Sequence, residues 1–337
     1  MIIVTKPDAT EAQLQHLLDR IKEWGFKAEV SRGAERVVVG VIGAEDAIRE
    51  MPLAAIPGVE SVTPVLKPYK LVAREFRGQT GIVKIGDVPI GGKEIVIMSG
   101  PCSVESREQI ISIGKDIAKA GARVLRGGAF KPRSSPYSFQ GLGVDGLKLL
   151  AEARDETGLP VITEVMDTRD LDVIEQYADC LQVGARNMQN FSLLKEVGRS
   201  KLPVMLKRGM SATIKDLLMS AEYILAEGNF NVLLCERGIR TFETYTRNTL
   251  DLNAVPVLQA ETHLPIVVDP THGIGLREHV VSMALAAVAC GADAIMCEVH
   301  NNPELAKSDG EQALLPHEFA DLVQRVKKVA EAVGRTV

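Results

Sequence analysis

A unit of short strand, loop and helix repeats eight times between residue 94 and residue 337, and this repeat limits the possible folds more than any other feature. Each strand candidate is a short apolar run that a polar turn follows, which is typical of buried parallel strands. We expect the strands at residues 95–98, 122–125, 160–164, 180–185, 203–207, 231–235, 265–269 and 294–298.

Helical stretches separate these strands, with the clearest at residues 107–120, 143–156, 212–226 and 278–290. A last helix at 316–333 gathers its apolar residues on one face: Phe319, Leu322, Val323, Val326, Ala330 and Val333. Eight β/α units predict an α/β fold, a (β/α)8 TIM barrel over residues 94–337. A doubly wound sheet is the alternative, but no Gly-x-Gly-x-x-Gly follows the first strand, so we rank it lower.

Residues 1–67 are expected to form a separate small α+β domain. Thr10 and Gln13 make a capping box ahead of a helix whose apolar residues recur at helical spacing. Strand candidates at residues 2–5, 27–31, 36–42 and 59–66, with a second helix near 44–50, complete a βαββαβ pattern. This order predicts a ferredoxin-like domain. Residues 68–93 are expected to be a linker and a short β-hairpin that closes the bottom of the barrel.

The composition excludes several classes of protein. A formal net charge of -5 argues against a nucleic-acid partner, because such binding depends on broad phosphate neutralisation. No apolar stretch reaches the roughly 18–20 residues that a membrane helix needs. The five cysteines include no Cys-x-x-Cys pair, so neither a disulfide scaffold nor a zinc ribbon is indicated. We therefore expect a reduced, cytoplasmic enzyme without a membrane partner.

The densest chemistry follows the second strand, where the sequence runs from Arg126 through two glycines to Lys131, Pro132, Arg133 and Ser134. Arginine grips phosphate or carboxylate with two parallel hydrogen bonds, lysine adds a mobile point charge, and glycine lets the backbone approach a ligand. An anionic ligand is the natural inference. The alternative is a solvated loop that its prolines merely stiffen.

The other strand ends also carry reactive side chains. In a TIM barrel they meet at one mouth, so they are expected to converge: Cys102, Arg126, Lys131, Glu164, Arg186, Lys207, Arg237, His272, Glu298 and, in the last loop, Asp309. Such a dense collection of cations and carboxylates needs bound anions and a bound cation to balance its charges. Part of the set can instead form an ion-pair layer with Glu164, Glu236 and Asp269.

Cys102, His272, Glu298 and Asp309 are the candidate metal ligands. A thiolate, an imidazole and two carboxylates suit Mn, Fe, Co or Zn and select none of them uniquely. Each residue also has a plainer interpretation: a small buried thiol, a core histidine, or an Asp-Gly turn. The four together, each after a different strand or in the final loop, favour a divalent metal.

Taken in order, these motifs resemble 3-deoxy-D-arabino-heptulosonate 7-phosphate (DAHP) synthase over the full chain. The segments that carry the resemblance are Gly100-Pro101-Cys102-Ser103, the 126–136 loop, Gly184-Ala185-Arg186-Asn187, Leu206-Lys207-Arg208-Gly209, Cys235-Glu236-Arg237-Gly238, Asp269-Pro270-Thr271-His272, Glu298-Val299-His300 and Ser308-Asp309-Gly310. The N-terminal unit resembles the regulatory domain of one branch of that family.

The resemblance implies that phosphoenolpyruvate condenses with erythrose 4-phosphate in the entry step of aromatic biosynthesis, the shikimate pathway. It assigns Arg133 and Ser134 to the phosphate of erythrose 4-phosphate and the four candidate ligands to a divalent metal, with Cys102, His272 and Lys131 at the catalytic centre. Lys131 is the candidate proton donor, with a bound water as its rival. Phosphoenolpyruvate would be held by Arg126, Lys131, Arg186, Lys207 and Arg237, with Glu164 at its reacting end.

Two alternatives accompany this interpretation. One is 3-deoxy-D-manno-octulosonate 8-phosphate (KDO8P) synthase, which uses arabinose 5-phosphate; the pair Pro132-Arg133 favours the shorter sugar. The other is a non-catalytic sensor of sugar phosphate or amino acid, which would be expected to lose a ligand or Lys131. The resemblance also implies a homotetramer and feedback inhibition by an aromatic amino acid at the N-terminal domain.

Overall fold

The structure is a computed structural model that describes residues 1–33, 36–43, 48, 51–63, 67–133 and 135–337. It divides into two compact units. The first comprises residues 1–81 together with 261–263, and the second comprises residues 82–260 and 264–337. In the described part of the chain, no helix is long and apolar enough to cross a membrane.

The first unit has the predicted ferredoxin-like fold. A four-stranded antiparallel sheet has the order β2-β3-β1-β4. Helix α1 starts at the expected capping box of Thr10 and Gln13. The second helix expected near 44–50 and the end of the strand expected at 59–66 lie largely outside the described residues. The elements are β1 (Ile2–Thr5), α1 (Glu11–Glu23), β2 (Lys27–Arg32), β3 (Val37–Ile42), η1 (Leu53–Ala55) and β4 (Val59–Thr63).

The segment after this sheet, expected to be a linker, is built into the first unit. It contains the short helix α3 (Arg74–Arg77), in which Phe76 is buried against Gly40. His263 Nε2 lies 2.7 Å from the carbonyl oxygen of Leu71. Burial lowers the pKa of His263 to about 4, so this imidazole is neutral near pH 7.

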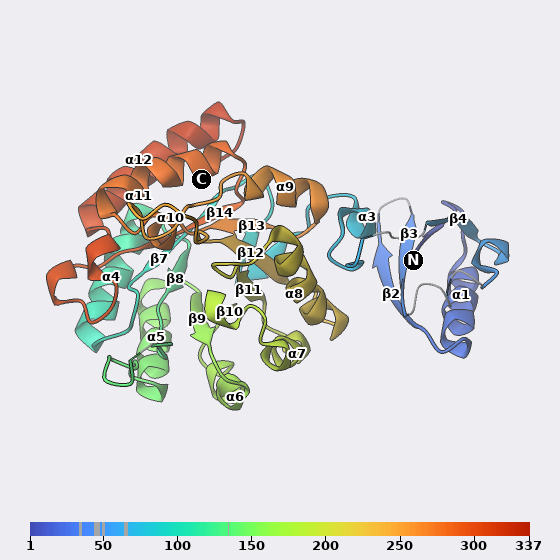
Figure 1. Ribbon diagram of the computed structural model, residues 1–337, viewed down its shortest axis with the longest axis horizontal. Coiled ribbons are helices and arrows are strands. Elements are labelled where there is room, and N and C mark those ends of the chain that lie inside the picture. Colours follow the sequence, from blue (N-terminus) through green and yellow to red (C-terminus); the bar gives the residue numbers. More distant parts are fainter. Residues whose placement is uncertain (34–35, 44–47, 49–50, 64–66, 134) are drawn as a thin grey trace. The chain divides into compact units, whose positions relative to one another are not determined.

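The second unit is a closed barrel of eight parallel strands, which confirms the TIM-barrel prediction (Figure 1). The strands follow one another in sequence order around the barrel, and β14 pairs with β7 to close it. They are β7 (Val96–Gly100), β8 (Val124–Arg126), β9 (Val161–Val165), β10 (Cys180–Val183), β11 (Val204–Lys207), β12 (Val232–Glu236), β13 (Ile266–Val268) and β14 (Ala294–Glu298).

The helices surround these strands (Figure 1). Ser106 and Thr213 cap α4 and α8 through their hydroxyl groups. Val333, expected on the apolar face of the last helix, is 43% exposed because it lies beyond the helix end. The helices are α4 (Arg107–Ala120), α5 (Val144–Thr157), α6 (Leu171–Ile174), α7 (Phe191–Arg199), α8 (Ile214–Ala226), α9 (Ala254–Glu261), α10 (Pro270–Ile274), α11 (Arg277–Ala289) and α12 (Pro316–Ala332).

A hairpin of β5 (Val83–Ile85) and β6 (Val88–Ile90) contributes to the barrel core. Its apolar side chains belong to one buried cluster with residues near the starts of the strands, among them Val96 and Val124. Apolar side chains therefore fill the N-terminal end of the barrel. Reactive side chains have room only at the opposite end, where the strands finish.

Candidate active site

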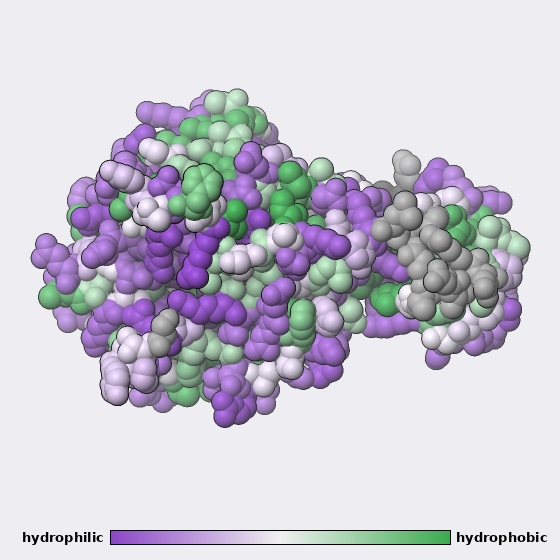
Figure 2. All heavy atoms as spheres, in the orientation of Figure 1, coloured by the Kyte–Doolittle hydropathy of each residue, from purple (hydrophilic) through white to green (hydrophobic). Residues whose placement is uncertain are grey.

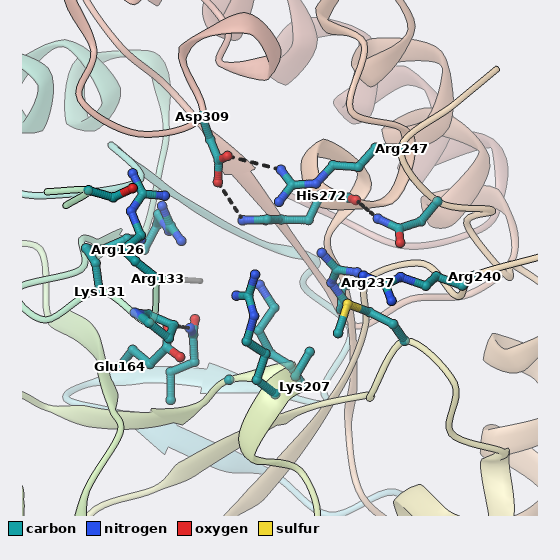
Figure 3. Close-up of a pocket in the computed structure, with 18 of the residues that line it drawn as sticks. Arg126, Lys131, Arg133, Glu164, Lys207, Arg237, Arg240, Arg247, His272 and Asp309 are labelled. Carbon is teal, nitrogen blue, oxygen red and sulfur yellow. Dashed lines mark hydrogen bonds and ion pairs between the residues drawn. The ribbon is translucent and has the colours of Figure 1, made fainter. Parts of the chain in front are cut away.

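A cavity of about 400 Å³ lies at the C-terminal ends of the barrel strands. Figure 2 shows hydrophilic side chains gathered on this face of the barrel unit, and Figure 3 shows the cations around the cavity. Its volume falls within the range of small-molecule sites. The charged side chains that line it are Arg126, Lys131, Arg133, Glu164, Arg186, Lys207, Arg237, Arg240, Arg247, His272 and Asp309.

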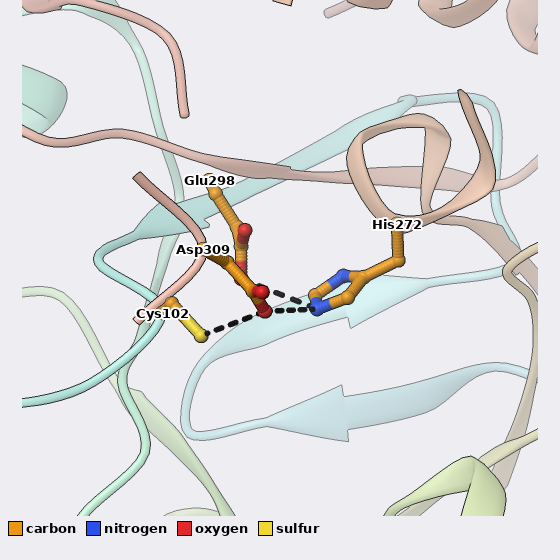
Figure 4. A group of neighbouring side chains, drawn as sticks. All are labelled: Cys102, His272, Glu298 and Asp309. Atoms are coloured by element: carbon orange, nitrogen blue, oxygen red, sulfur yellow. Dashed lines mark hydrogen bonds and ion pairs between the residues drawn. The ribbon is translucent and has the colours of Figure 1, made fainter. Parts of the chain in front are cut away.

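The four candidate metal ligands come together at one side of this cavity (Figure 4). One ligand atom from each of Cys102, His272, Glu298 and Asp309 lies within 4.8 Å of all the others. His272 Nε2 is 3.3 Å from Glu298 Oε1 and 3.8 Å from Asp309 Oδ2. The sulfur, nitrogen and oxygen atoms therefore surround one point, and this donor set fits a divalent metal such as Mn, Fe, Co or Zn.

His272 is oriented by Asp269. Asp269 caps the short helix α10 by accepting a hydrogen bond from the backbone nitrogen of His272, and Pro270 occupies the first helical position. The second carboxylate oxygen of Asp269 lies 2.7 Å from His272 Nδ1. This contact places the proton on Nδ1 and leaves Nε2 as the acceptor that faces the other ligands.

The electrostatics of the cluster follow from burial and from the neighbouring cations. Burial raises the pKa of the Cys102 thiol to about 11. Burial alone would also raise the pKa of Glu298, but the positive charges of His272, in its protonated form, and of Arg126 outweigh it and hold that pKa below its usual value. Asp309 is likewise shifted down despite its burial, by His272 and Arg247. The carboxylates are thus ready to bind a cation, whereas the thiol must first release a proton.

Lys131 folds back from its loop onto the metal cluster. Its Nζ lies 3.0 Å from the Cys102 sulfur and 3.0 Å from the Cys102 carbonyl oxygen. Gly128 makes this possible, because a Cβ there would lie 2.9 Å from both Lys131 Cδ and the Cys102 oxygen. Gly128 is therefore needed so that the Lys131 side chain can approach Cys102. The sequence had suggested instead that the glycines let a ligand approach the backbone.

Among the described residues, the alternative ion-pair layer is present only in part, since Lys207–Asp269 is the one expected pair that forms. Arg126 Nη1 lies 3.0 Å from Glu298 Oε1, and Lys207 bonds to Asp269. Glu236 pairs with Arg208, 2.9 Å away, rather than with a cation of the cavity. Arg237 is only 6% exposed, burial lowers its pKa, and no ion pair joins it to a carboxylate of the described residues. A buried guanidinium in this state is poised to accept an anion.

Glu164 lines the cavity, and its position depends on a glycine that directly follows the next strand, β10. A Cβ on Gly184 would lie only 2.0 Å from Glu164 Oε1. Gln182 Nε2 donates to the other oxygen of Glu164, at 3.3 Å. The missing side chain at 184 therefore creates the space that Glu164 fills.

The remaining predicted residues line the cavity or lie outside the described part of the chain. Arg133 donates to the carbonyl oxygens of Phe139 and Lys307 at 3.2 and 2.9 Å and borders the cavity. Arg186 is exposed at the cavity wall. Ser134 lies outside the described residues.

Sequence reasoning missed Arg240, Arg247 and Gln312. The first two line the cavity from the loop between β12 and α9, and Gln312 Nε2 donates to Glu298 Oε2 at 2.6 Å. The loop is long and has no periodic pattern, so nothing in the sequence aimed these side chains at the mouth. The repeated arginines at 237, 240 and 247 were the only available signal.

Comparison with known proteins agrees with this geometry. The family model described as "DAHP synthetase I family" matches residues 74–335, and the "DAHP synthase ferredoxin-like domain" matches residues 1–67. The chain belongs to the DAHP synthetase I family. It is 49% identical, over 99% of both chains, to phospho-2-dehydro-3-deoxyheptonate aldolase of Thermotoga maritima. The crystal structure of the Thermotoga maritima DAHP synthase superposes with a TM-score of 0.79 at 47% identity, covering 100% of this chain and 98% of that one.

Two further relatives match a smaller share of this chain. A 2-dehydro-3-deoxyphosphooctonate aldolase of Syntrophobacter fumaroxidans is 30% identical over 73% of this chain and 91% of its own length. A truncated DAHP synthase of Thermotoga maritima covers 79% of this chain and 98% of its own, with a TM-score of 0.75 and 48% identity. The predicted DAHP synthase function is therefore confirmed in preference to KDO8P synthase.

Proposed function

We propose that this DAHP synthase condenses phosphoenolpyruvate with erythrose 4-phosphate and water at the mouth of the barrel, releasing DAHP and inorganic phosphate. The observation that carries the proposal is the cavity itself, in which cations from successive strand ends lie beside the cluster of metal-ligand side chains. Two substrates that each bear a phosphate, with about −1.5 to −2 charges at pH 7, neutralise such a site. The five cations at the inner end hold the reactants in near-attack geometry.

Phosphoenolpyruvate is assigned to the inner part of the cavity, with Arg126, Lys131, Arg186, Lys207 and Arg237 on its phosphate and carboxylate. The unpaired, buried guanidinium of Arg237 supports this assignment most directly, because its burial is offset only when an anion arrives. Glu164 is assigned to the reacting end. Erythrose 4-phosphate is assigned to the outer part, with its phosphate on Arg133 and Ser134.

A divalent cation is assigned to Cys102, His272, Glu298 and Asp309; the support is their mixed donor set and the carboxylate that orients His272. When bound, it supplies the Lewis acidity that polarises the aldehyde of erythrose 4-phosphate. Arg126 keeps Glu298 ionised through its 3.0 Å contact. These side chains thus hold charge in place before the reactants enter.

In the reaction, the enol carbon of phosphoenolpyruvate forms a bond to the aldehyde carbon of the sugar. Water then adds at the carbon that bears the phosphate, and inorganic phosphate leaves. Lys131 is assigned as the donor of the proton to the new hydroxyl group, with a bound water as the alternative. Its Nζ borders both the cavity and the Cys102 sulfur, at 3.0 Å from the latter, which supports this role.

The test is the initial rate of metal-stripped protein with phosphoenolpyruvate and either erythrose 4-phosphate or arabinose 5-phosphate, before and after addition of Mn²⁺. Loss of phosphoenolpyruvate and release of phosphate are followed together. Metal-dependent turnover with erythrose 4-phosphate alone is the expected result. Preference for the pentose phosphate would transfer the chain to the neighbouring activity. Tight metal binding without turnover would favour the sensor, although Lys131 and all four ligand side chains are present.

We also propose that the ferredoxin-like unit binds an aromatic amino acid and inhibits the enzyme, and that the chain forms a homotetramer. The match of residues 1–67 to the family's ferredoxin-like domain supports this role. The sheet ends in two edge strands, β2 and β4, and such edges favour pairing with another copy. A cytoplasmic location is also proposed, because all five cysteines are free thiols.

Deletion of residues 1–67 tests the regulatory proposal. The truncated protein should keep its turnover number and lose inhibition by phenylalanine or tyrosine. Inhibition that persists in the truncated protein would show that the effector acts elsewhere. Light scattering of both forms measures the subunit number and whether it depends on the same domain.

A further inference from the structure

The loop between β12 and α9, residues 237–253, touches the metal cluster as well as the substrate cavity. Arg247 Nη1 lies 3.2 Å from Asp309 Oδ1 (Figure 3). The same nitrogen lies 2.6 Å from Gln312 Oε1. The amide nitrogen of Gln312 in turn donates to Glu298 Oε2 at 2.6 Å. Two candidate ligands, Asp309 and Glu298, are therefore joined through one arginine and one glutamine.

Each of these contacts is made to the carboxylate oxygen other than the one that lies near His272. Asp309 offers Oδ2 to His272 and gives Oδ1 to Arg247. Glu298 presents Oε1 to His272, with Arg126 Nη1 also 3.0 Å from that oxygen, and gives Oε2 to Gln312. A carboxylate whose outer oxygen is held cannot rotate freely, so its inner oxygen stays aimed at the cation.

The third ligand is held from the same loop. Asn248 Nδ2 donates to the carbonyl oxygen of His272 at 2.8 Å, and the backbone nitrogen of Arg247 donates to the carbonyl oxygen of Ile274 at 3.0 Å. Gly275 ends helix α10 with a φ of 71°, and a Cβ there would lie 2.3 Å from the Cβ of Arg247. The fit between this loop and the helix of His272 is therefore close.

The backbone of Asp309 has an unfavourable conformation. Its φ of 52° is the one positive value found at a non-glycine residue among the described positions. A backbone in the left-handed region costs free energy and persists only where the surroundings fix it. Arg247 supplies a contact of opposite charge to the side chain of that residue.

We propose that Arg247 and Gln312 are positioning residues that hold the carboxylates of Asp309 and Glu298 in the geometry that binds the cation. This inference rests on the proposed function, because it presupposes a divalent metal at the cluster. It goes beyond that function in tying the metal site to the loop that also carries Arg237 and Arg240. Removal of comparable outer contacts weakens metal binding by about 10- to 100-fold.

The experiment measures the Kd of Co²⁺ for metal-stripped protein, by thiolate absorption and by competition with a chelator. The variants are R247M, Q312M and the double variant, with R247K as the conservative change. R240Q is the matched control, because Arg240 lies in the same loop and lines the same cavity but makes no side-chain contact with the ligands among the described residues. Thermal unfolding identifies any variant that does not fold.

We expect the Kd of Co²⁺ to rise by about 10- to 100-fold in R247M and Q312M. The rise should be smaller in R247K, and R240Q should show none. The double variant should lose less than the product of the two single effects, because both residues act through one network. Unchanged Kd in folded R247M and Q312M would overturn the proposal, as would an equal rise in R240Q. Equal Co²⁺ affinity of wild-type protein and C102S would contradict the metal assignment itself. That outcome is distinguishable from a failure of the positioning proposal, which concerns only Arg247 and Gln312.

Discussion

The glycine at position 184 allows a precise test of Glu164. Gly184 has φ −67° and ψ 157°, an extended conformation that alanine adopts without strain. An added Cβ would lie 2.0 Å from Glu164 Oε1, whereas ordinary contact begins at 3.4 Å. Because Glu164 is flexible, its carboxylate rather than the backbone must move, by about 1.4 Å, the difference between those two distances. G184A is thus expected to displace one cavity side chain and leave the fold intact.

A misplacement of about 1 Å in an active site can lower the rate by about 100-fold. We therefore expect kcat/KM for phosphoenolpyruvate to fall by about 100-fold in G184A, which corresponds to about 2.7 kcal/mol. The free energy of unfolding should change by less than about 1 kcal/mol, because the alanine also restricts the unfolded chain. Phosphate release at saturating metal and erythrose 4-phosphate measures the first quantity, and chemical denaturation measures the second.

G92A is the matched control, since a Cβ on Gly92 has no atom within 4 Å. E164A provides the second control, because it removes the carboxylate that the new methyl group would strike. In the E164A background, G184A should have no further effect on kcat/KM. Wild-type kcat/KM in G184A, or full additivity of the two changes, would show that the proximity of these residues does not govern the site.

Three further outcomes are expected. R237K should lower kcat/KM for phosphoenolpyruvate by about 10- to 100-fold, because lysine cannot make the two parallel hydrogen bonds that a guanidinium makes to an anion. Each such hydrogen bond to a charged group contributes about 1.5–3 kcal/mol. An unchanged kcat/KM would show that Arg237 does not bind the substrate. C102S should bind Co²⁺ at least about 100-fold more weakly at an unchanged melting temperature, and equal affinity would contradict the thiolate assignment. Burial lowers the pKa of His263 from 6.5 to about 4, so stability present above pH 6.5 should be lost as pH falls towards 4, by up to about 3 kcal/mol. In H263Q, the free energy of unfolding measured with urea should not show this dependence on pH. If it changed with pH as steeply as in the wild type, the assignment of this effect to His263 would be wrong.

The barrel was predictable because each of its strands is a short apolar run that a polar turn interrupts, and because helices of matching length lie between them. Helix α4 begins and ends at the expected residues, 107 and 120, since Ser106 caps one end and Gly121 adopts a left-handed conformation at the other. The short helix α10 was not predicted. Five residues are too few to show a period, although Asp269 and Pro270 are a helix-start signal.

The convergence of the site was predictable for side chains at strand ends, because the fold alone fixes where those ends meet. Cys102, His272, Glu298 and Asp309 were grouped on that basis, and the structure brings them together. The contacts of Arg247 and Gln312 were not predictable. They depend on the path of an irregular loop and on which oxygen of a carboxylate is free, and neither property has a sequence period.

The metal-ligand cluster lies where β7 and β14 pair to close the barrel. The hydroxyl of Ser99 in β7 donates to the carbonyl oxygen of Cys297 in β14, at 3.1 Å and a sequence separation of 198 residues. Cys102 follows β7, while Glu298 and Asp309 belong to β14 and the segment after it.

During synthesis these two strands cannot meet until almost the whole chain has left the ribosome, so this pairing forms late. Three of the four ligand side chains come from these two strands or the segments after them: Cys102 follows β7, Glu298 ends β14, and Asp309 follows β14. A cation held there binds only the closed barrel, and by mass action it therefore favours closure over opening. The cluster thus couples cation binding to the pairing of two strands that lie far apart in the sequence.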